Sequence, residues 1–232
     1  MRISALVSGG KDSVYAAALT EMQFGPVDEL LTLHPVDPES RMFHTPNLEL
    51  VALLARAWGR PHRAIRATAP GEEAEERALR EALAGPPRVV VAGAIASNYQ
   101  FGRLDRLCYD LGHRLYVPLW QKAADRVVRA EIEAGLDIRL THLAAEPLGR
   151  ELAGRRFDAE LLEELRGRSS RVRAFHLAGE GGEYESLVVD APFLGSRLVW
   201  DREEVTGDHH TTRWRPVGVR LEPKRARGPE RG

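Results

Sequence analysis

The sequence predicts an α/β protein with a doubly wound, mostly parallel sheet, completed by a smaller α+β part. Short apolar runs alternate with helix-patterned segments through about the first 145 residues, as a parallel sheet with crossover helices requires. Residues 88–92 include three consecutive valines, which is typical of a strand buried on both faces. After about residue 146 the segments become more polar and this alternation stops.

Each expected element has a local signal. Apolar residues at helical spacing fill residues 47–58, and Gly59 and Pro61 end that helix. Residues 72–83 are rich in Glu, Ala, Arg and Leu, which favour a helix. In chain order, the expected elements are strand 3–7, helix 14–22, strand 29–33, helix 47–58, strand 62–67, helix 72–83, strand 88–92, helix 104–111, strand 114–117, helix 123–134, strand 136–141, helix 157–166 and strands 184–189 and 217–221.

These elements divide the chain into three parts. Residues 1–145 form the α/β domain, residues 146–222 form a smaller α+β part that completes a cleft, and residues 223–232 form a tail. The tail is basic and rich in Pro and Gly, so we expect it to be flexible.

Composition excludes several classes of protein. The 232 residues suffice for one substantial core, and the formal net charge of −1 makes nucleic acid an unlikely partner. No apolar run is long enough to span a bilayer, so we expect no membrane segment. The single cysteine, Cys108, excludes an internal disulfide and fits a reducing cytoplasm.

The most informative segment is Ser-Gly-Gly-Lys-Asp-Ser at residues 8–13, between the first strand and the first helix. Adjacent glycines let the backbone turn tightly, and the N–H groups of the turn and helix start can bind an anion. An ordinary β-turn-α corner is the alternative. The residues expected to hold a nucleotide's phosphates are Ser8, Gly9, Gly10, Lys11, Asp12 and Ser13.

This segment does not have the spacing of a Walker A loop, because no glycine stands five residues before Gly10 and Asp12 separates Lys11 from Ser13. It resembles instead the loop of the PP-loop ATP pyrophosphatases, which cleave ATP to AMP and pyrophosphate. That resemblance implies a HUP-like nucleotide-binding domain over residues 1–145.

A second polar segment directly follows the strand at 88–92. Residues at the carboxyl ends of strands line the ligand crevice of a doubly wound sheet. The alternative is a polar helix start capped by Ser97 or Asn98. The candidate contacts are Gly93 and Ser97 for the nucleotide, and Tyr99, Gln100 and Arg103 for the substrate.

A third segment, residues 179–186, places three carboxylates among glycines before an apolar strand. Such carboxylates repel one another unless a cation intervenes, for example a Mg²⁺–nucleotide, an amine or an ammonium ion. A solvated acidic hairpin is the alternative. The candidate substrate-binding residues here are Glu180, Gly181, Gly182, Glu183, Tyr184, Glu185 and Ser186. For His209 and His210, which lack partners at ligand spacing, we favour a solvated loop over a metal site.

Together with residues 42–47, 118–120 and 148–150, these segments resemble the diphthine–ammonia ligase family in its short prokaryotic form, up to about residue 192. The resemblance implies that a carboxylate attacks the α-phosphorus of ATP, that pyrophosphate leaves, and that ammonia then displaces AMP to form an amide. It adds His44 and Asn47 as substrate-binding candidates. Two departures are Phe101, where a basic residue is expected, and Ser186 in place of threonine.

The resemblance also implies roles. Lys11 and Asp12 would be catalytic, with Asp12 a ligand of Mg²⁺ directly or through water, and Glu183 and Glu185 would act on the ammonium or the substrate. The roles of Glu180, Glu183 and Glu185 are not separable from the sequence. The expected partners are ATP, ammonia and a carboxylate, which in this family belongs to elongation factor 2 and would do so here if the source is archaeal; a homodimer is an open alternative.

Three other functions stay open at this stage. A PP-loop enzyme of this fold would amidate another carboxylate if the source is a bacterium. An RNA-modifying enzyme is disfavoured by the single cysteine and the near-neutral charge. A nucleotide-binding sensor without catalysis is disfavoured by the intact residues 11–13 and the acidic segment.

Overall fold

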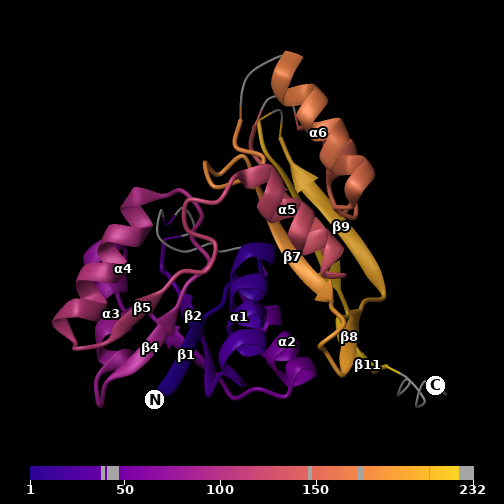
Figure 1. Cartoon of the computed structure of the whole chain (residues 1–232). Coiled ribbons are helices and arrows are strands. Elements are labelled where there is room, and N and C mark those ends of the chain that lie inside the picture. Colours follow the sequence, from indigo (N-terminus) through magenta and orange to yellow (C-terminus); the bar gives the residue numbers. More distant parts are fainter. Residues whose placement is uncertain (38–39, 41–46, 146–147, 172–174, 209, 225–232) are drawn as a thin grey trace.

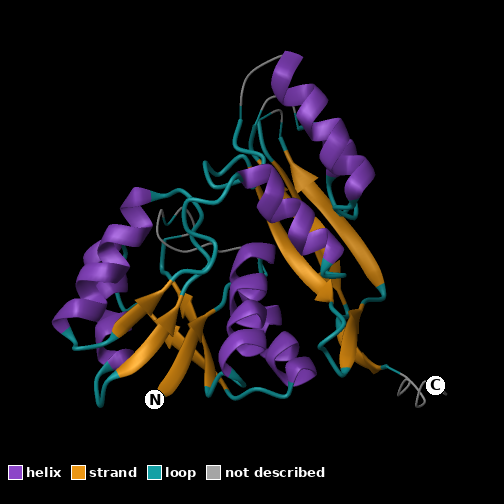
Figure 2. Cartoon of the chain, in the orientation of Figure 1, coloured by secondary structure: helices purple, strands orange, loops and turns teal. Residues whose placement is uncertain are grey.

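The structure, a computed structural model, describes residues 1–37, 40, 47–145, 148–171, 175–208 and 210–224. Two main sheets, each with its own helices, form two layers that meet along helices α1 and α2 (Figures 1 and 2). The first sheet has five parallel strands and the second has four antiparallel strands. The predicted fold class is confirmed.

The first sheet reverses its strand order next to its central strand. Its strands are β1 (Arg2–Leu6), β2 (Glu29–His34), β3 (His62–Arg66), β4 (Arg88–Val91) and β5 (Arg114–Tyr116). They lie in the order β3-β2-β1-β4-β5. The chain therefore moves outward from β1 to β3 and then returns to the other side of β1. Ligands of doubly wound sheets bind at such a reversal, beyond the carboxyl ends of the strands.

Helices cover both faces of this sheet (Figure 1). Helices α1 (Lys11–Phe24) and α2 (Val51–Trp58), with the short helix η1 (Leu48–Leu50), lie on one face, and α3 (Glu72–Leu83) and α4 (Asn98–Asp110) lie on the other. Buried leucines of α3 and α4 form one core with β2 and β4. Buried residues of α1 and α2 belong to a larger core that continues into the second sheet. The two sheets are thus joined by shared apolar packing.

The second sheet is built by the later part of the chain. Its strands β6 (Asp137–Leu143), β7 (Tyr184–Asp190), β9 (Arg202–Gly207) and β10 (Thr212–Val217) lie in the order β7-β6-β10-β9. The remaining elements are α5 (Ala124–Glu133), η2 (Arg150–Leu152), α6 (Ala159–Arg171) and the pair β8 (Ser196–Val199) and β11 (Arg220–Pro223). The expected boundary at residue 145 falls just after β6, which already belongs to the second sheet. The chain changes sheet earlier, between β5 and β6.

One predicted strand is interrupted. Of the segment 217–221, Val217 ends β10, Arg220 and Leu221 begin β11, and the two residues between them form a turn with Gly218 at φ +71°. A Cβ at Gly218 would lie 2.3 Å from a carboxylate oxygen of Asp201. The chain reverses here because only glycine combines that backbone angle with so close a neighbour.

Strands β8, β9 and β10 were not predicted. In β10 the buried Thr212, Trp214 and Pro216 alternate with the exposed Arg213 and Arg215. This period of two was a readable signal, which the arginines and the proline obscured. Helix α4 also begins at Asn98, earlier than the predicted residue 104, because the Ser97 side chain caps it.

No helix within the described ranges is both long and apolar enough to cross a membrane.

We predict that Cys108 does not react with a thiol reagent in the native protein. Its side chain lies in the core beneath α4, and burial raises the pKa of the thiol to about 12. At pH 8 the reactive thiolate is then on the order of one part in ten thousand. Titration with Ellman's reagent at pH 8 should detect no thiol in the native protein and one per chain in guanidinium chloride. Fast native labelling would contradict the burial.

Candidate functional site

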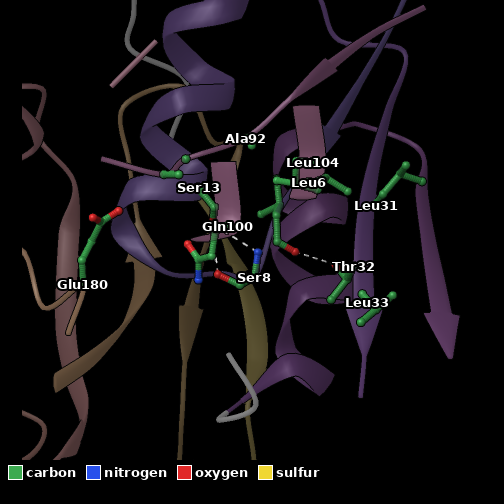
Figure 3. Close-up of a pocket in the computed structure, with 13 residues that line it drawn as sticks. Leu6, Ser8, Ser13, Leu31, Thr32, Leu33, Ala92, Gln100, Leu104 and Glu180 are labelled. Atoms are coloured by element: carbon green, nitrogen blue, oxygen red, sulfur yellow. Dashed lines mark hydrogen bonds between the residues drawn. The ribbon is translucent and has the colours of Figure 1, made fainter. Parts of the chain in front are cut away.

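The candidate site lies at the strand reversal of the first sheet. A pocket opens between the loops that follow β1 and β4, and it is lined by Leu6, Val7, Ser8, Ser13, Leu31, Thr32, Leu33, Ala92, Gly93, Ala94, Gln100, Leu104 and Glu180. In Figure 3, the side chains of Ser8, Ser13 and Gln100 lie close together, between Glu180 and the leucines of β1 and β2. One wall is therefore polar and the other apolar, which suits a ligand with an apolar ring and a charged end.

Hydroxyl groups hold the loop between β1 and α1 in shape. The Ser8 N–H donates to Ser13 Oγ at 3.1 Å, and Ser13 Oγ donates to the Gly10 carbonyl at 3.0 Å. Gly9 has φ +85°, a conformation that favours glycine. The loop leads directly into α1 at Lys11, so its N–H groups lie at the positive end of the helix dipole. This arrangement can bind an anion.

The same loop is seated on strand β7 of the second sheet. The Val188 N–H donates to the Gly9 carbonyl at 2.9 Å, and the Lys11 N–H donates to Ser186 Oγ at 3.2 Å. A Cβ on Gly9 would lie 3.2 Å from a methyl group of Val51 and 3.3 Å from one of Leu187. The structure therefore brings together the glycine loop and the acidic segment, which are about 170 residues apart in the sequence.

Lys11 does not line either of the two pockets beside the loop. Its side chain is fully buried, and its Nζ lies 2.6 Å from Asp12 Oδ1, 3.6 Å from Glu131 Oε2 and 5.9 Å from the centre of the Tyr184 ring. Burial opposes the charge of Lys11, but the carboxylates of Asp12 and Glu131 outweigh it and raise the pKa of the ammonium above its ordinary value. Lys11 is thus a charged group inside the protein.

Glu131, on α5, is a candidate that the sequence reasoning missed. Its side chain is fully buried, and neither carboxylate oxygen has a hydrogen-bond partner among the described residues. Burial raises the pKa of this carboxyl well above its usual range; the Lys11 ammonium opposes this rise and the Asp12 carboxylate adds to it. The sequence did contain a signal that Glu131 is buried. It stands four residues after Val127 and three after Val128, and so lies on the apolar face of the helix.

The acidic segment contributes two different carboxylates to the structure. The Glu180 carboxylate accepts the backbone N–H groups of Ile95 and Ala96, and so links this segment to the loop after β4. The Glu183 carboxylate accepts the N–H groups of His176 and Gly181, both at 2.8 Å, and holds its own loop. Glu180 is therefore placed at the pocket, whereas Glu183 is engaged in the turn behind it.

The remaining residues of this segment line a small cleft beside the glycine loop. The cleft is formed by Ser8, Gly10, Ala178, Gly179, Glu180, Tyr184, Glu185 and Ser186. Tyr184 is buried, which raises the pKa of its phenol, and its hydroxyl donates to the Leu177 carbonyl at 2.7 Å. The Gly181 N–H bonds the Glu183 carboxylate, and a Cβ on Gly181 would lie 2.6 Å from that carboxylate. The next residue, Gly182, has φ +79°. Glu185 is the acidic side chain of this segment that borders the cleft together with Glu180.

The segment after β4 separates into pocket residues and packing residues. Gly93 and Gln100 line the pocket, whereas Ser97 accepts the Gln100 N–H at 3.3 Å as a helix cap. Tyr99 is exposed, and its hydroxyl accepts a hydrogen bond from Arg103 at 3.2 Å.

The Arg103 side chain pairs with carboxylates of α3 and does not line the pocket. Its guanidinium bonds Glu72 at 2.9 Å and Glu76 at 2.8 Å. Phe101, where the resemblance leads one to expect a basic residue, stacks on Trp120 with ring centres 4.3 Å apart. An aromatic contact thus takes the place of a charge at this position.

Two substrate-binding candidates lie at the edge of what the structure describes. His44 falls outside the described residues. Asn47 is buried, with φ 59°, and caps the short helix η1.

The expected magnesium ligand, Asp12, has one side-chain oxygen bound to Lys11 and a quarter of its side chain exposed. Within the described part of the chain, no group of three or more His, Cys, Asp or Glu side chains could hold a metal ion. Asp12 thus offers a cation one carboxylate donor at the start of α1.

Comparison with known proteins agrees with this geometry. Residues 1–115 match the family model described as "Diphthamide synthase N-terminal domain", and residues 124–215 match "Diphthamide synthase C-terminal domain". The chain belongs to the diphthamide synthase family. The predicted family, and with it the assignment to the ligases, is confirmed. The gap between the two matches, residues 116–123, spans the connection from β5 to α5, where the chain changes sheet.

Named relatives of the family cover most of the chain. It is 29% identical over 236 residues to the diphthine–ammonia ligase of Mus musculus, covering 88% of this chain and 84% of the mouse protein. It is 28% identical over 228 residues to that of Homo sapiens, covering 88% and 85%. It is 30% identical over 227 residues to that of Schizosaccharomyces pombe; the match covers 88% of this chain but only 37% of that longer protein.

A solved structure titled "predicted subunit of tRNA methyltransferase" from Methanocaldococcus jannaschii is 16% identical, with a TM-score of 0.47, and the match covers 83% of this chain and 98% of that one.

We predict that Gly93→Ala damages the site, whereas Gly102→Ala does not. A Cβ at Gly93 would lie 2.6 Å from the Ser13 nitrogen and 2.7 Å from the Asp12 carbonyl carbon, so the start of α1 would have to shift. At Gly102, within α4, nothing lies within 4 Å of a new Cβ, and alanine should stabilise the helix by up to about 1 kcal/mol. Thermal unfolding should show a lower Tm for Gly93→Ala and an equal or higher Tm for Gly102→Ala. Equal Tm values for Gly93→Ala and the wild type would contradict the close packing.

Proposed function

We propose that this chain is an ATP-dependent, amide-forming ligase that adenylates a carboxylate, releases pyrophosphate and lets ammonia displace AMP. The observation that carries the proposal is the seating of the loop 8–13 on β7, which puts an anion-binding turn beside the acidic segment 179–186. Family membership supports ATP-dependent ligation in diphthamide synthesis. On the family's named activity, the carboxylate is that of diphthine, which the resemblance places on elongation factor 2.

The two walls of the pocket suit the two ends of ATP. We infer that Leu6, Leu31 and Leu33 contact the adenine, because they provide an apolar surface at the ends of β1 and β2. The phosphates would then reach the loop between β1 and α1, where backbone N–H groups and the hydroxyls of Ser8 and Ser13 can donate to them. Gly93 and Gln100 close the pocket from the side of β4.

Asp12 would hold Mg²⁺ together with the phosphates of the nucleotide. When bound, that ion supplies charge neutralisation on the phosphates. Asp12 itself keeps an oriented carboxylate at the start of α1, because Lys11 bonds one of its oxygens at 2.6 Å.

Chemistry at the α-phosphorus requires stabilisation of charge on the departing pyrophosphate. Loop N–H groups at the start of α1 provide fixed donors for this charge and need no reorganisation as it develops. On the acceptor side, Glu180 and Glu185 border the cleft beside the loop, so we propose that they bind ammonium or orient the carboxylate substrate. Glu183 acts by shaping the turn that presents them.

We predict that ATP is converted to AMP and pyrophosphate when a carboxylate substrate and ammonia are both supplied. A coupled pyrophosphate assay with nucleotide chromatography measures this, and diphthine-bearing elongation factor 2 is the first acceptor to test. A parallel reaction without ammonia should accumulate the acyl-adenylate, detectable by mass spectrometry. Release of ADP and phosphate would overturn the proposed reaction.

We predict that Asp12→Asn lowers kcat at least about tenfold, because it removes the one carboxylate that the glycine loop presents to the nucleotide. The matched control is Asp110→Asn, at the exposed end of α4, where the carboxylate pairs with Arg80 on the surface. Steady-state kinetics with varied ATP should show a lower kcat for Asp12→Asn and a wild-type kcat for Asp110→Asn. If both variants keep the wild-type kcat, Asp12 has no part in the chemistry.

A further inference from the structure

The fully buried carboxylate of Glu131 is the feature of the described structure that the proposed function leaves unused. It lies on α5, outside the six segments that carry the family resemblance. Neither of its oxygens accepts a hydrogen bond from a described residue by distance, the Lys11 ammonium lies 3.6 Å away, and the Asp12 carboxylate is also close enough to act on its charge. A polar group buried without hydrogen bonds is costly, so its presence here calls for a physical reason.

A contribution of the Lys11–Glu131 pair to folding stability does not explain why Glu131 is buried. A buried ion pair loses the hydration of both partners, and apolar side chains of similar volume often serve the fold equally well. Lys11 and Glu131 lie among apolar residues of α1, α5 and β7 that would accept such a replacement. Tyr184, the other polar side chain that faces them, has its hydroxyl committed to the Leu177 carbonyl.

We propose that Glu131 is a positioning residue that acts through Lys11 on Asp12. The inference rests on the proposed function, in which Asp12 is presented to the nucleotide. Three groups follow one another from the interior toward the partly exposed start of α1: the buried Glu131 carboxylate, the buried Lys11 ammonium and the partly exposed Asp12 carboxylate.

The middle group of this series has little freedom. Lys11 Nζ is drawn toward Glu131 on one side and bonds Asp12 at 2.6 Å on the other, with the face of the Tyr184 ring 5.9 Å away. Attraction between opposite charges is strong in an interior that excludes water. An ammonium held in this way offers Asp12 a fixed partner.

Asp12, by contrast, needs such a partner. It stands in the first turn of α1 with a quarter of its side chain exposed, so its carboxylate would otherwise be free to turn into solvent. Small displacements of a group that positions a reacting substrate lower rates steeply. Glu131 therefore serves the site from a position that never touches the nucleotide.

The decisive variant replaces the pair together, as Lys11→Met with Glu131→Leu. Because both charges are removed at once, we expect a protein that folds with a Tm close to that of the wild type. Its kcat should nevertheless fall about tenfold or more, while the KM for ATP changes less than about threefold. A double variant that is as active as the wild type would overturn the proposal and make the pair a packing element only.

A double-mutant cycle tests whether the pair acts through Asp12. In an Asp12→Asn background, the paired replacement should cause little further loss of kcat, because the group it positions is already gone. Losses that multiply would show that the pair acts independently of Asp12 and would overturn the proposal. Glu133→Gln is the matched control, since Glu133 is an exposed residue of the same helix.

A crystal structure of the paired variant supplies a readout that does not depend on the reaction. The Asp12 carboxylate should leave the place that it occupies beside Lys11, and an unmoved carboxylate would overturn the proposal. Failure of the ligase reaction in the wild type, with every carboxylate tested, would instead count against the proposed function.

Discussion

The seating of the glycine loop on strand β7 is the contact on which the rest of the site depends. Two bonds make it: the Val188 N–H reaches the Gly9 carbonyl, and the Ser186 hydroxyl accepts the Lys11 N–H. Strand β7 is at the edge of its sheet, so its outer backbone groups need partners. The loop provides one of them, and in return its own backbone is held in a tight turn. The shape of the loop and the pairing of the second sheet's edge are therefore coupled.

This contact brings charged groups into the interior. Lys11 enters the space between α1, α5 and β7, where it is fully buried and where, among the described residues, Asp12 and Glu131 balance its charge. In the opposite direction, the Glu180 carboxylate, from the second part of the chain, accepts hydrogen bonds from the N–H groups that follow β4. Both strands at the reversal of the first sheet, β1 and β4, are thus followed by loops that the second half of the protein holds. These links tie the glycine loop, the loop after β4 and the acidic segment together.

Much of the first sheet was predictable because local signals agree with the fold there. The helix at 72–83 and the strand at 88–91 were readable from composition alone, and the loop 8–13 was recognisable because its glycines and hydroxyls stand at fixed spacing between a strand and a helix. Strands β8 to β10 were harder to recognise. Arginines alternate with the buried residues of β10, and none of the residues of β9 is buried. Residues such as Arg103 looked like ligands from the sequence, and only packing showed that Glu72 and Glu76 bind it.

The sequence by itself determined the fold class, the glycine loop between the first strand and the first helix, and the family, because these depend on residues that are neighbours along the chain. The tertiary structure alone decided which distant side chains meet that loop. It directed Lys11 inward to Glu131, gave Glu183 to its own turn and left Glu180 and Glu185 at the cleft. The physical reason is that charge pairing and burial depend on distances in space. Nothing in the local sequence of α5 indicates that its Glu131 will lie next to Lys11, which is about 120 residues earlier in the chain.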